Sequence, residues 1–302
     1  MVLVSVPATT ANLGPGFDVL GLALNLYNFV EMRLSSRGLT IEVEGEGKAS
    51  IPTDDRNIVF QAARKVWNKC GFAYPGLHIK LSNNIPLARG LGSSAAAITG
   101  GIVAANALAG YPLSTTELLK LASEFEGHPD NVAPALLGGL VMSIVDGAHI
   151  YAHKIEIRPD IRIGAVIPHF PLSTKKGRQL LPKQVPLEDA VYNISRTAFL
   201  ITAFLQDRLD LLTYGMQDKL HQPYRSSVIP GMEQALQRAR AAGAQGVALS
   251  GSGPTLVAFC GEHNIDEVCH AMETAFQEQG IEVSIMKLLP DNQGARVING
   301  GY

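Results

Sequence analysis

One glycine- and serine-rich segment, residues 85–97 with the sequence IPLARGLGSSAAA, constrains the fold and chemistry of this chain more than any other. Its two glycines lack a Cβ, so the backbone beside them can approach a bulky anion closely. The alanine-rich run that follows predicts a helix over residues 92–108, whose first turn presents unpaired N–H groups and the positive end of its dipole. The segment therefore predicts a phosphate cradle. Its members are Arg89, Gly90, Gly92, Ser93 and Ser94.

The same segment fits other interpretations. Ser93 or Ser94 could simply cap the helix without any ligand. A dinucleotide-binding loop of the Rossmann type also fits, because residues 90–95 match G-x-G-x-x-A. Two features count against it: the glycines follow a long loop instead of leaving a strand directly, and no acidic residue for a ribose occurs in the following 20 or so residues. A Walker A loop is absent, since Gly47-Lys48 is followed by alanine. The segment alone leaves the cradle and the capped helix open.

Strand and helix patterns are mixed in both halves of the chain, which predicts an α+β protein. A length of 302 residues, with 46% hydrophobic and 17% charged residues, is sufficient for two globular domains. We expect these at residues 1–152 and 153–302. Strands are predicted at 3–7, 28–35, 39–44, 77–81, 162–168, 246–249, 255–260 and 282–288, and helices at 57–69, 92–108, 115–125, 230–242, 265–279 and within 187–216.

Composition excludes several functional classes. The net charge is −2, and no basic block or basic-aromatic stripe indicates a nucleic-acid partner. The apolar N-terminal run stops too early for a signal peptide, and the apolar stretch 136–145 is too short to span a bilayer, so no membrane association is expected. Three cysteines without a C-x-x-C pair fit a reducing compartment, which predicts a cytoplasmic protein.

Four motifs in order carry a resemblance to a known family. Residues 7–21, PATTANLGPGFDVLG, resemble the N-terminal signature of homoserine kinases, and residues 90–97 resemble the phosphate loop shared by GHMP kinases. Residues 246–255, GVALSGSGPT, are similar to the C-terminal glycine motif of these kinases. Residues 126–134, EGHPDNVAP, are typical of the homoserine branch. The matches span nearly the whole chain.

The resemblance implies a two-domain fold with its active site between the domains. The N-terminal domain would bind ATP on an unusual βαβ crossover, and the C-terminal domain would be ferredoxin-like. The implied activity is phosphorylation of the side-chain hydroxyl of L-homoserine by ATP with Mg²⁺, feeding threonine synthesis, and relatives suggest a homodimer. Two alternatives stay open: a GHMP kinase for another small alcohol, and a non-catalytic metabolite-binding regulator on the same fold.

The resemblance also assigns a nucleotide site. The loop would hold the triphosphate, and Ser94 or Ser93 would join Glu126 in holding Mg²⁺, an ion that prefers such hard oxygen ligands. Asn57 would touch the adenosine, or else cap the helix that follows it. Arg89 stands where many relatives carry Lys, which can change the geometry of the phosphate contact. The implied nucleotide-binding set is Asn57, Pro86, Leu87, Ala88, Arg89, Gly90, Leu91, Gly92, Ser93, Ser94, Ala95 and Ala96.

Homoserine is a zwitterion, so its site needs opposite charges a few ångströms apart. By resemblance, Asp18 would bind the ammonium, and Asn12 would hydrogen-bond it or orient the hydroxyl. Arginine can grip a carboxylate with two parallel hydrogen bonds. The carboxylate-binding arginines would be Arg178 and Arg225, and Thr174 and Gly253 complete the implied substrate-binding set.

The implied catalytic set is Asp130, Asn131 and Glu126. Asp130 stands near the position where other GHMP kinases keep a catalytic aspartate. The homoserine branch is thought to pass the hydroxyl proton to the phosphate without a dedicated base. Our hypothesis is therefore that Asp130 organises the loop and the charge around the metal, with a role as general base as the alternative.

Overall fold

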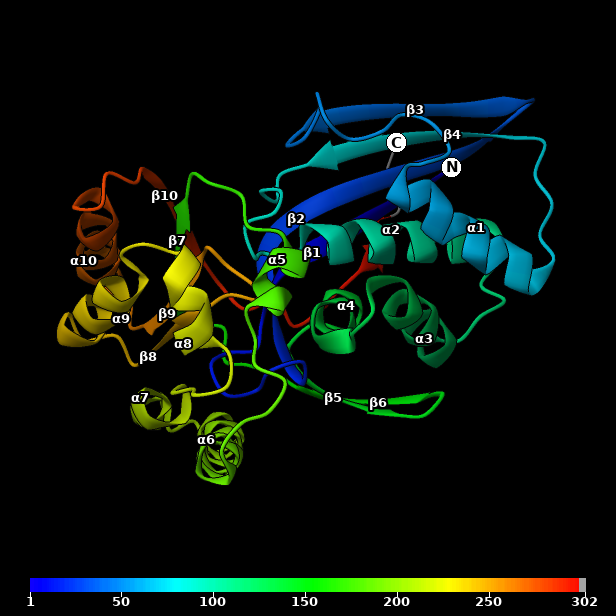
Figure 1. Ribbon diagram of the computed structural model, residues 1–302. Helices are drawn as coiled ribbons and strands as arrows, with labels where there is room; N and C mark the ends of the chain where they lie inside the picture. The colour runs from blue at the N-terminus through cyan, green and yellow to red at the C-terminus, as the bar shows by residue number, and fades with distance from the viewer. Residues whose placement is uncertain (299–302) are drawn as a thin grey trace.

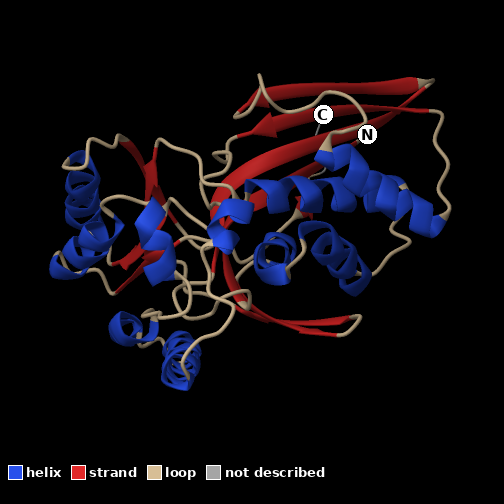
Figure 2. Cartoon of the chain, in the orientation of Figure 1, coloured by secondary structure: helices blue, strands red, loops and turns tan. Residues whose placement is uncertain are grey.

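The computed structural model describes residues 1–298, which form two β-sheets with helices packed against each (Figures 1 and 2). The first sheet has the order β11-β1-β2-β4-β3, and β5 pairs with β2 and with β6. Its strands are β1 (Val2–Ala11), β2 (Leu20–Ser35), β3 (Gly38–Gly45), β4 (Gly76–Asn83), β5 (Leu140–Asp146), β6 (His149–Ile155) and β11 (Arg296–Val297).

The expected βαβ crossover is formed by β3 and β4, which pair in parallel and are joined by helix α1 (Ile58–Cys70). Asn57 caps this helix: its Oδ1 accepts hydrogen bonds from the N–H groups of Val59 and Phe60. Gly71, in the left-handed conformation, ends it. The buried indole of Trp67 donates a hydrogen bond to Ala105 O (3.0 Å), which ties α1 to the neighbouring helix.

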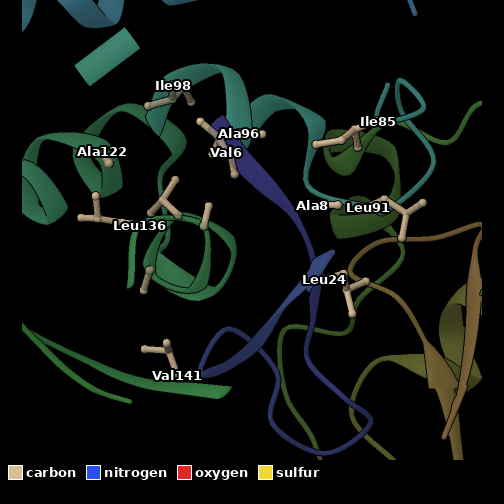
Figure 3. Packing of buried hydrophobic residues seen from close by; sticks show 14 of the residues in the cluster. Val6, Ala8, Leu24, Ile85, Leu91, Ala96, Ile98, Ala122, Leu136 and Val141 are labelled. Atoms are coloured by element: carbon tan, nitrogen blue, oxygen red, sulfur yellow. The ribbon is translucent and has the colours of Figure 1, made fainter. Parts of the chain in front are cut away.

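Three further helices complete the first half: α2 (Ser93–Leu108), α3 (Thr115–Glu126) and α4 (Pro129–Leu137). Helix α2 lies beside α1 and against β1 and β2 (Figure 1). It is apolar on all sides, as expected for a helix enclosed by other elements. Figure 3 shows Val6 of β1, Ala96 of α2 and Leu136 of α4 in the core between them. This packing fixes the start of α2, which follows the glycine-rich loop at residues 85–92.

The second sheet is antiparallel with the order β10-β7-β9-β8, covered by α9 and α10, which pack on each other. This order and the helix positions match the ferredoxin-like arrangement. Its strands are β7 (Arg162–Pro168), β8 (Gly246–Leu249), β9 (Leu256–Cys260) and β10 (Val283–Leu288). Its helices are α5 (Thr174–Gln179), α6 (Leu187–Leu205), α7 (Leu212–Gly215), α8 (Gln222–Arg225), α9 (Met232–Ala241) and α10 (Ile265–Gln277), with short 3₁₀ turns at Leu209–Leu211 and Ser226–Val228.

Several elements differ from the sequence prediction. Strand β2 begins at residue 20 instead of 28, and residues 20–24 are buried on both faces, so they lack the alternation that marks a half-exposed strand. The short helices α4, α5 and α8 were not predicted. The expected boundary between residues 152 and 153 falls within β6, and β11 returns to pair with β1. Within residues 1–298, none of the helices has both the length and the apolar composition that crossing a bilayer requires.

Candidate active site

A cavity of about 450 Å³ is lined by both halves of the chain: by β2, β4 and α2 of the first, and by α5, α8 and the loop after β8 of the second. The sequence-predicted residues that line it are Asn12, Asp18, Asn57, Leu87, Ala88, Arg89, Gly90, Gly92, Ser93, Ser94, Glu126, Asp130, Asn131, Thr174, Arg178, Arg225 and Gly253. Four predicted residues do not line it: Pro86, Leu91, Ala95 and Ala96. The last three are fully buried in the core beneath the loop.

The glycine-rich loop at residues 85–92 ends at Gly92, which is the N-cap of α2 and has a left-handed backbone (φ 70°). Within residues 1–298 no side chain caps this helix, so the capped-helix reading of Ser93 or Ser94 is wrong. Glycine is favoured at residues 90 and 92 for two reasons: both have a positive φ, and a side chain at either position would clash with a neighbouring residue. A Cβ on Gly92 would lie 1.9 Å from Thr9 Oγ1, and a Cβ on Gly90 would lie 2.3 Å from Ser250 O. The uncapped first turn leaves its N–H groups free for an anion.

The C-terminal glycine motif holds this loop in place. Ser250 Oγ lies 2.6 Å from Gly90 O and 2.9 Å from Thr10 Oγ1. The Thr255 N–H donates a hydrogen bond to Arg89 O (3.2 Å). Three motifs that are far apart in the sequence therefore meet at one point.

The side chains of Ser94 and Glu126 meet beside the start of α2. Ser94 Oγ donates a hydrogen bond of 2.9 Å to Glu126 Oε2. Burial raises the pKa of Glu126, and the charge of Asp130 adds to this, while the hydrogen bond from Ser94 acts against it. The raised pKa means that the charge of His128 and the hydrogen bond from Ser94 do not offset the cost of desolvating this half-buried carboxylate. A hard divalent cation fits this donor set.

Asp130, 3% exposed in the first turn of α4, is held by its neighbours. Its Oδ1 lies 2.6 Å from His128 Nδ1 and accepts a hydrogen bond from Asn131 Nδ2 (3.3 Å). The hydroxyl of Thr9 donates to Asn131 Oδ1 (2.8 Å). Burial alone would lower the pKa of His128, but the hydrogen bond and charge of Asp130 outweigh it, and the pKa is raised. Asp130 is thus already paired with a basic group.

Asp18 lies beside these residues, with a carboxylate oxygen within 4.8 Å of both His128 and Asp130. It forms a two-pronged ion pair with Arg178, with N–O distances of 2.6 and 3.0 Å. Asp18 lies in a loop with a left-handed backbone (φ 59°), and its N–H donates to Asn12 Oδ1 (3.0 Å). Asn12 Nδ2 donates in turn to Gly251 O (2.9 Å). The amide of Asn12 therefore shapes the loop that presents Asp18. The pair joins a residue before β2 to one on α5.

Arg225 is 1% exposed, which is unusual for an arginine. Its Nη1 donates to Gly251 O (2.9 Å) and lies 3.0 Å from His221 Nδ1. Its Nε has no hydrogen-bond partner within residues 1–298. Burial, with the nearby charge of Arg178, lowers the pKa of Arg225 to about 10, so it stays a cation at neutral pH. A buried guanidinium with an unpaired donor can bind an anion in the cavity.

Sequence reasoning missed several residues that line the cavity, among them Phe17, Arg56, His128 and Ser252. Phe17, His128 and Ser252 lie inside the quoted motifs, so their position within a motif is the signal that could have identified them. Asn57 lines the cavity as well, but its Oδ1 caps α1 and its Nδ2 donates to Pro52 O (2.7 Å). The capping interpretation of Asn57 is confirmed.

The comparisons with known proteins agree over the whole chain. Residues 57–139 match the family model for the GHMP kinase N-terminal domain, and residues 200–278 match that for the C-terminal domain. The homoserine kinase of Moorella thermoacetica is 51% identical over 99% of this chain and 100% of its own length. That of Carboxydothermus hydrogenoformans is 49% identical, covering 98% and 96%. A crystal structure of homoserine kinase from Cytophaga hutchinsonii, 33% identical, superposes with a TM-score of 0.90 and covers 98% and 97%.

Proposed function

This chain belongs to the homoserine kinases of the GHMP kinase family, and we propose that its cavity transfers the γ-phosphoryl group of ATP to the side-chain hydroxyl of L-homoserine. The product would be O-phospho-L-homoserine, an intermediate of threonine biosynthesis. One observation carries the assignment of residues. The same cavity is lined by the uncapped start of α2 and by Asp18, Arg178 and Arg225.

The nucleotide would lie with its phosphates at the start of α2. The free N–H groups of the first turn and the guanidinium of Arg89 would bind the phosphate oxygens. The adjoining wall of the cavity is mainly apolar, as suits the faces of a purine base. It includes Ile51, Pro52, Val59 and Leu81. Asn57 would shape this wall through its hydrogen bonds to α1 and Pro52.

Ser94 and Glu126 would hold Mg²⁺, whose charge neutralises the phosphates during transfer. The support for this proposal is the 2.9 Å contact that brings the oxygens of Ser94 and Glu126 together, with the raised pKa of the Glu126 carboxyl, which a bound cation would lower, as a second observation. Ser94 would then turn its lone pairs towards the ion. Ser93 lines the cavity too, but Ser94 is the serine within hydrogen-bond distance of Glu126.

The substrate would replace an interaction that the protein makes with itself. In the free protein Asp18 and Arg178 neutralise each other. A zwitterion can separate them at little electrostatic cost, because its ammonium pairs with Asp18 while its carboxylate pairs with Arg178 and Arg225. Thr174, at the start of α5, and Gly253 lie on the same wall. An alcohol with only one charge would leave one of the two groups unpaired.

Asp130 would organise the site. Its Oδ1 lies 2.6 Å from His128 Nδ1 and also accepts from Asn131 Nδ2, so both contacts hold the carboxylate through the same oxygen. Phosphoryl transfer depends on positioning and charge neutralisation more than on a strong base. The hydroxyl proton would pass to the transferred phosphate.

The test is ATP turnover by purified protein with homoserine, mevalonate, galactose and shikimate, followed by identification of the phosphorylated product. We expect ADP release with homoserine and a phosphate ester on its side-chain oxygen. Faster turnover of another alcohol would identify a GHMP kinase of different specificity. Binding of homoserine without ADP release would identify a metabolite-binding regulator.

A further inference from the structure

The two arginines that would bind the substrate carboxylate lie close to each other and repel. The charge of Arg178 contributes to the lowered pKa of Arg225. Arg178 is paired with Asp18 in the free protein, but this pair must open when a zwitterion binds. At that moment two cations must stay side by side, aimed at one carboxylate. Hydrogen bonds to Gly251 O and His221 hold Arg225, so another group is needed to keep Arg178 beside it.

The ring of Phe17 contacts both Arg178 and Arg225. The Cζ atoms of Arg178 and Arg225 each lie 5.4 Å from its centroid. The ring also stacks on the imidazole of His221, with centroids 5.3 Å apart and an angle of 29°. The face of an aromatic ring is negative and attracts a guanidinium without neutralising it. Phe17 thus attracts both arginines without occupying any of their N–H groups.

The position of Phe17 is itself fixed. His221 is fully buried, and its Nε2 donates a hydrogen bond to Gly14 O (2.7 Å). Its Nδ1 is therefore free to accept from Arg225 Nη1 (3.0 Å). Thr197 Oγ1, on α6, donates to Pro15 O (3.1 Å). The loop that carries Phe17 is anchored by the same imidazole that anchors Arg225.

We propose that Phe17 is a positioning residue for recognition of the substrate carboxylate: its ring keeps Arg178 and Arg225 adjacent once Arg178 leaves Asp18. This inference rests on the proposed function, because it takes the carboxylate of homoserine as the ligand of the arginines. Phe17 was not among the residues assigned to the site from the sequence. Leucine at this position could fill the volume but has no negative face.

The first experiment compares Phe17→Leu with Phe17→Tyr in steady-state kinetics. We expect Phe17→Leu to raise the KM for homoserine about tenfold, the effect of one or two ring–cation contacts, with kcat and the KM for ATP changed less than about twofold. Phe17→Tyr keeps the ring and should stay within about twofold of wild type. Homoserinol has the ammonium but no carboxylate, so Phe17→Leu and Phe17→Tyr should have the same KM for it.

Tyr192→Leu is the matched control. The ring of Tyr192 also contacts two cations, Arg196 at 4.3 Å and Lys219 at 4.9 Å, but it does not line the cavity. We expect its KM for homoserine to be unchanged. A rise equal to that of Phe17→Leu would mean that ring–cation contacts in this region act on folding, and the inference would fail.

The second experiment replaces Phe17 with singly, doubly and triply fluorinated phenylalanine, which weakens the negative face at nearly constant shape. The KM for homoserine should rise stepwise with fluorination, and an unchanged KM across the series overturns the inference even if Phe17→Leu folds poorly. An equal loss with homoserinol also overturns it. Failure of wild type to phosphorylate homoserine at all would instead overturn the proposed function.

Discussion

Replacement of Asp18 by Asn separates the substrate role of this carboxylate from its role in stability. The change removes one charge and keeps the shape of the side chain. The ion pair with Arg178 is partly exposed, at 32% and 36% of the two side chains. Exposed pairs contribute at most about 1 kcal/mol, so the melting temperature of a protein of this size should fall by no more than about 4 °C.

The effect on substrate binding should be larger. A hydrogen bond to a charged group contributes about 1.5–3 kcal/mol, which corresponds to a loss of about 10- to 150-fold in kcat/KM for homoserine. For γ-hydroxybutyrate, which has the carboxylate but no ammonium, the loss should be absent. In the variant Arg178 no longer has a charged internal partner, so kcat/KM for γ-hydroxybutyrate should even rise.

The assay is ADP release with each alcohol, together with thermal unfolding of both proteins. Parallel losses with homoserine and γ-hydroxybutyrate would show that Asp18 does not bind the ammonium. A fall in melting temperature well beyond 4 °C would show that the ion pair is structural, and the reasoning from its exposure would be refuted.

Further predictions concern the metal, the proton and pH. Ser94→Ala should raise the Mg²⁺ concentration needed for half-maximal activity about tenfold or more, whereas Ser93→Ala should change it little, and a Mg²⁺ titration with ATP saturating compares the two. Asp130→Asn should slow single-turnover phosphoryl transfer by less than about tenfold; a collapse in rate with unchanged binding would identify a general base instead. Burial lowers the pKa of His221, so below about pH 6.5 the unfolded chain binds a proton that the folded protein does not. The free energy of unfolding should therefore fall as the pH drops below about 6.5, and urea unfolding should show a smaller drop in His221→Gln.

The sequence predicted the parts of the site that depend on local patterns. The glycines of the phosphate loop, the start of α2 within one residue and the cap at Asn57 all follow from short-range rules, and the structure has them. The four motifs predicted that distant segments meet, and Ser250 indeed contacts Gly90.

What the sequence could not reveal depends on contacts between distant residues. Nothing in the neighbourhood of Phe17 indicates that two arginines, more than 150 residues away, lie against its ring. The serines of the loop looked like helix caps because only the structure shows that Gly92 occupies the cap position. The first half of β2 was missed because burial on both faces removes the alternation on which strand prediction relies.

The contact between Ser250 and Gly90 has a consequence for biosynthesis of the protein. The loop that would receive the phosphates is braced by a serine 160 residues further along the chain, and the first sheet gains its edge strand from residues 296–297. A ribosome makes both of these segments after the loop. During synthesis the loop at residues 85–92 therefore emerges without its support, and its contact with Ser250 can form only after the C-terminal glycine motif has been made.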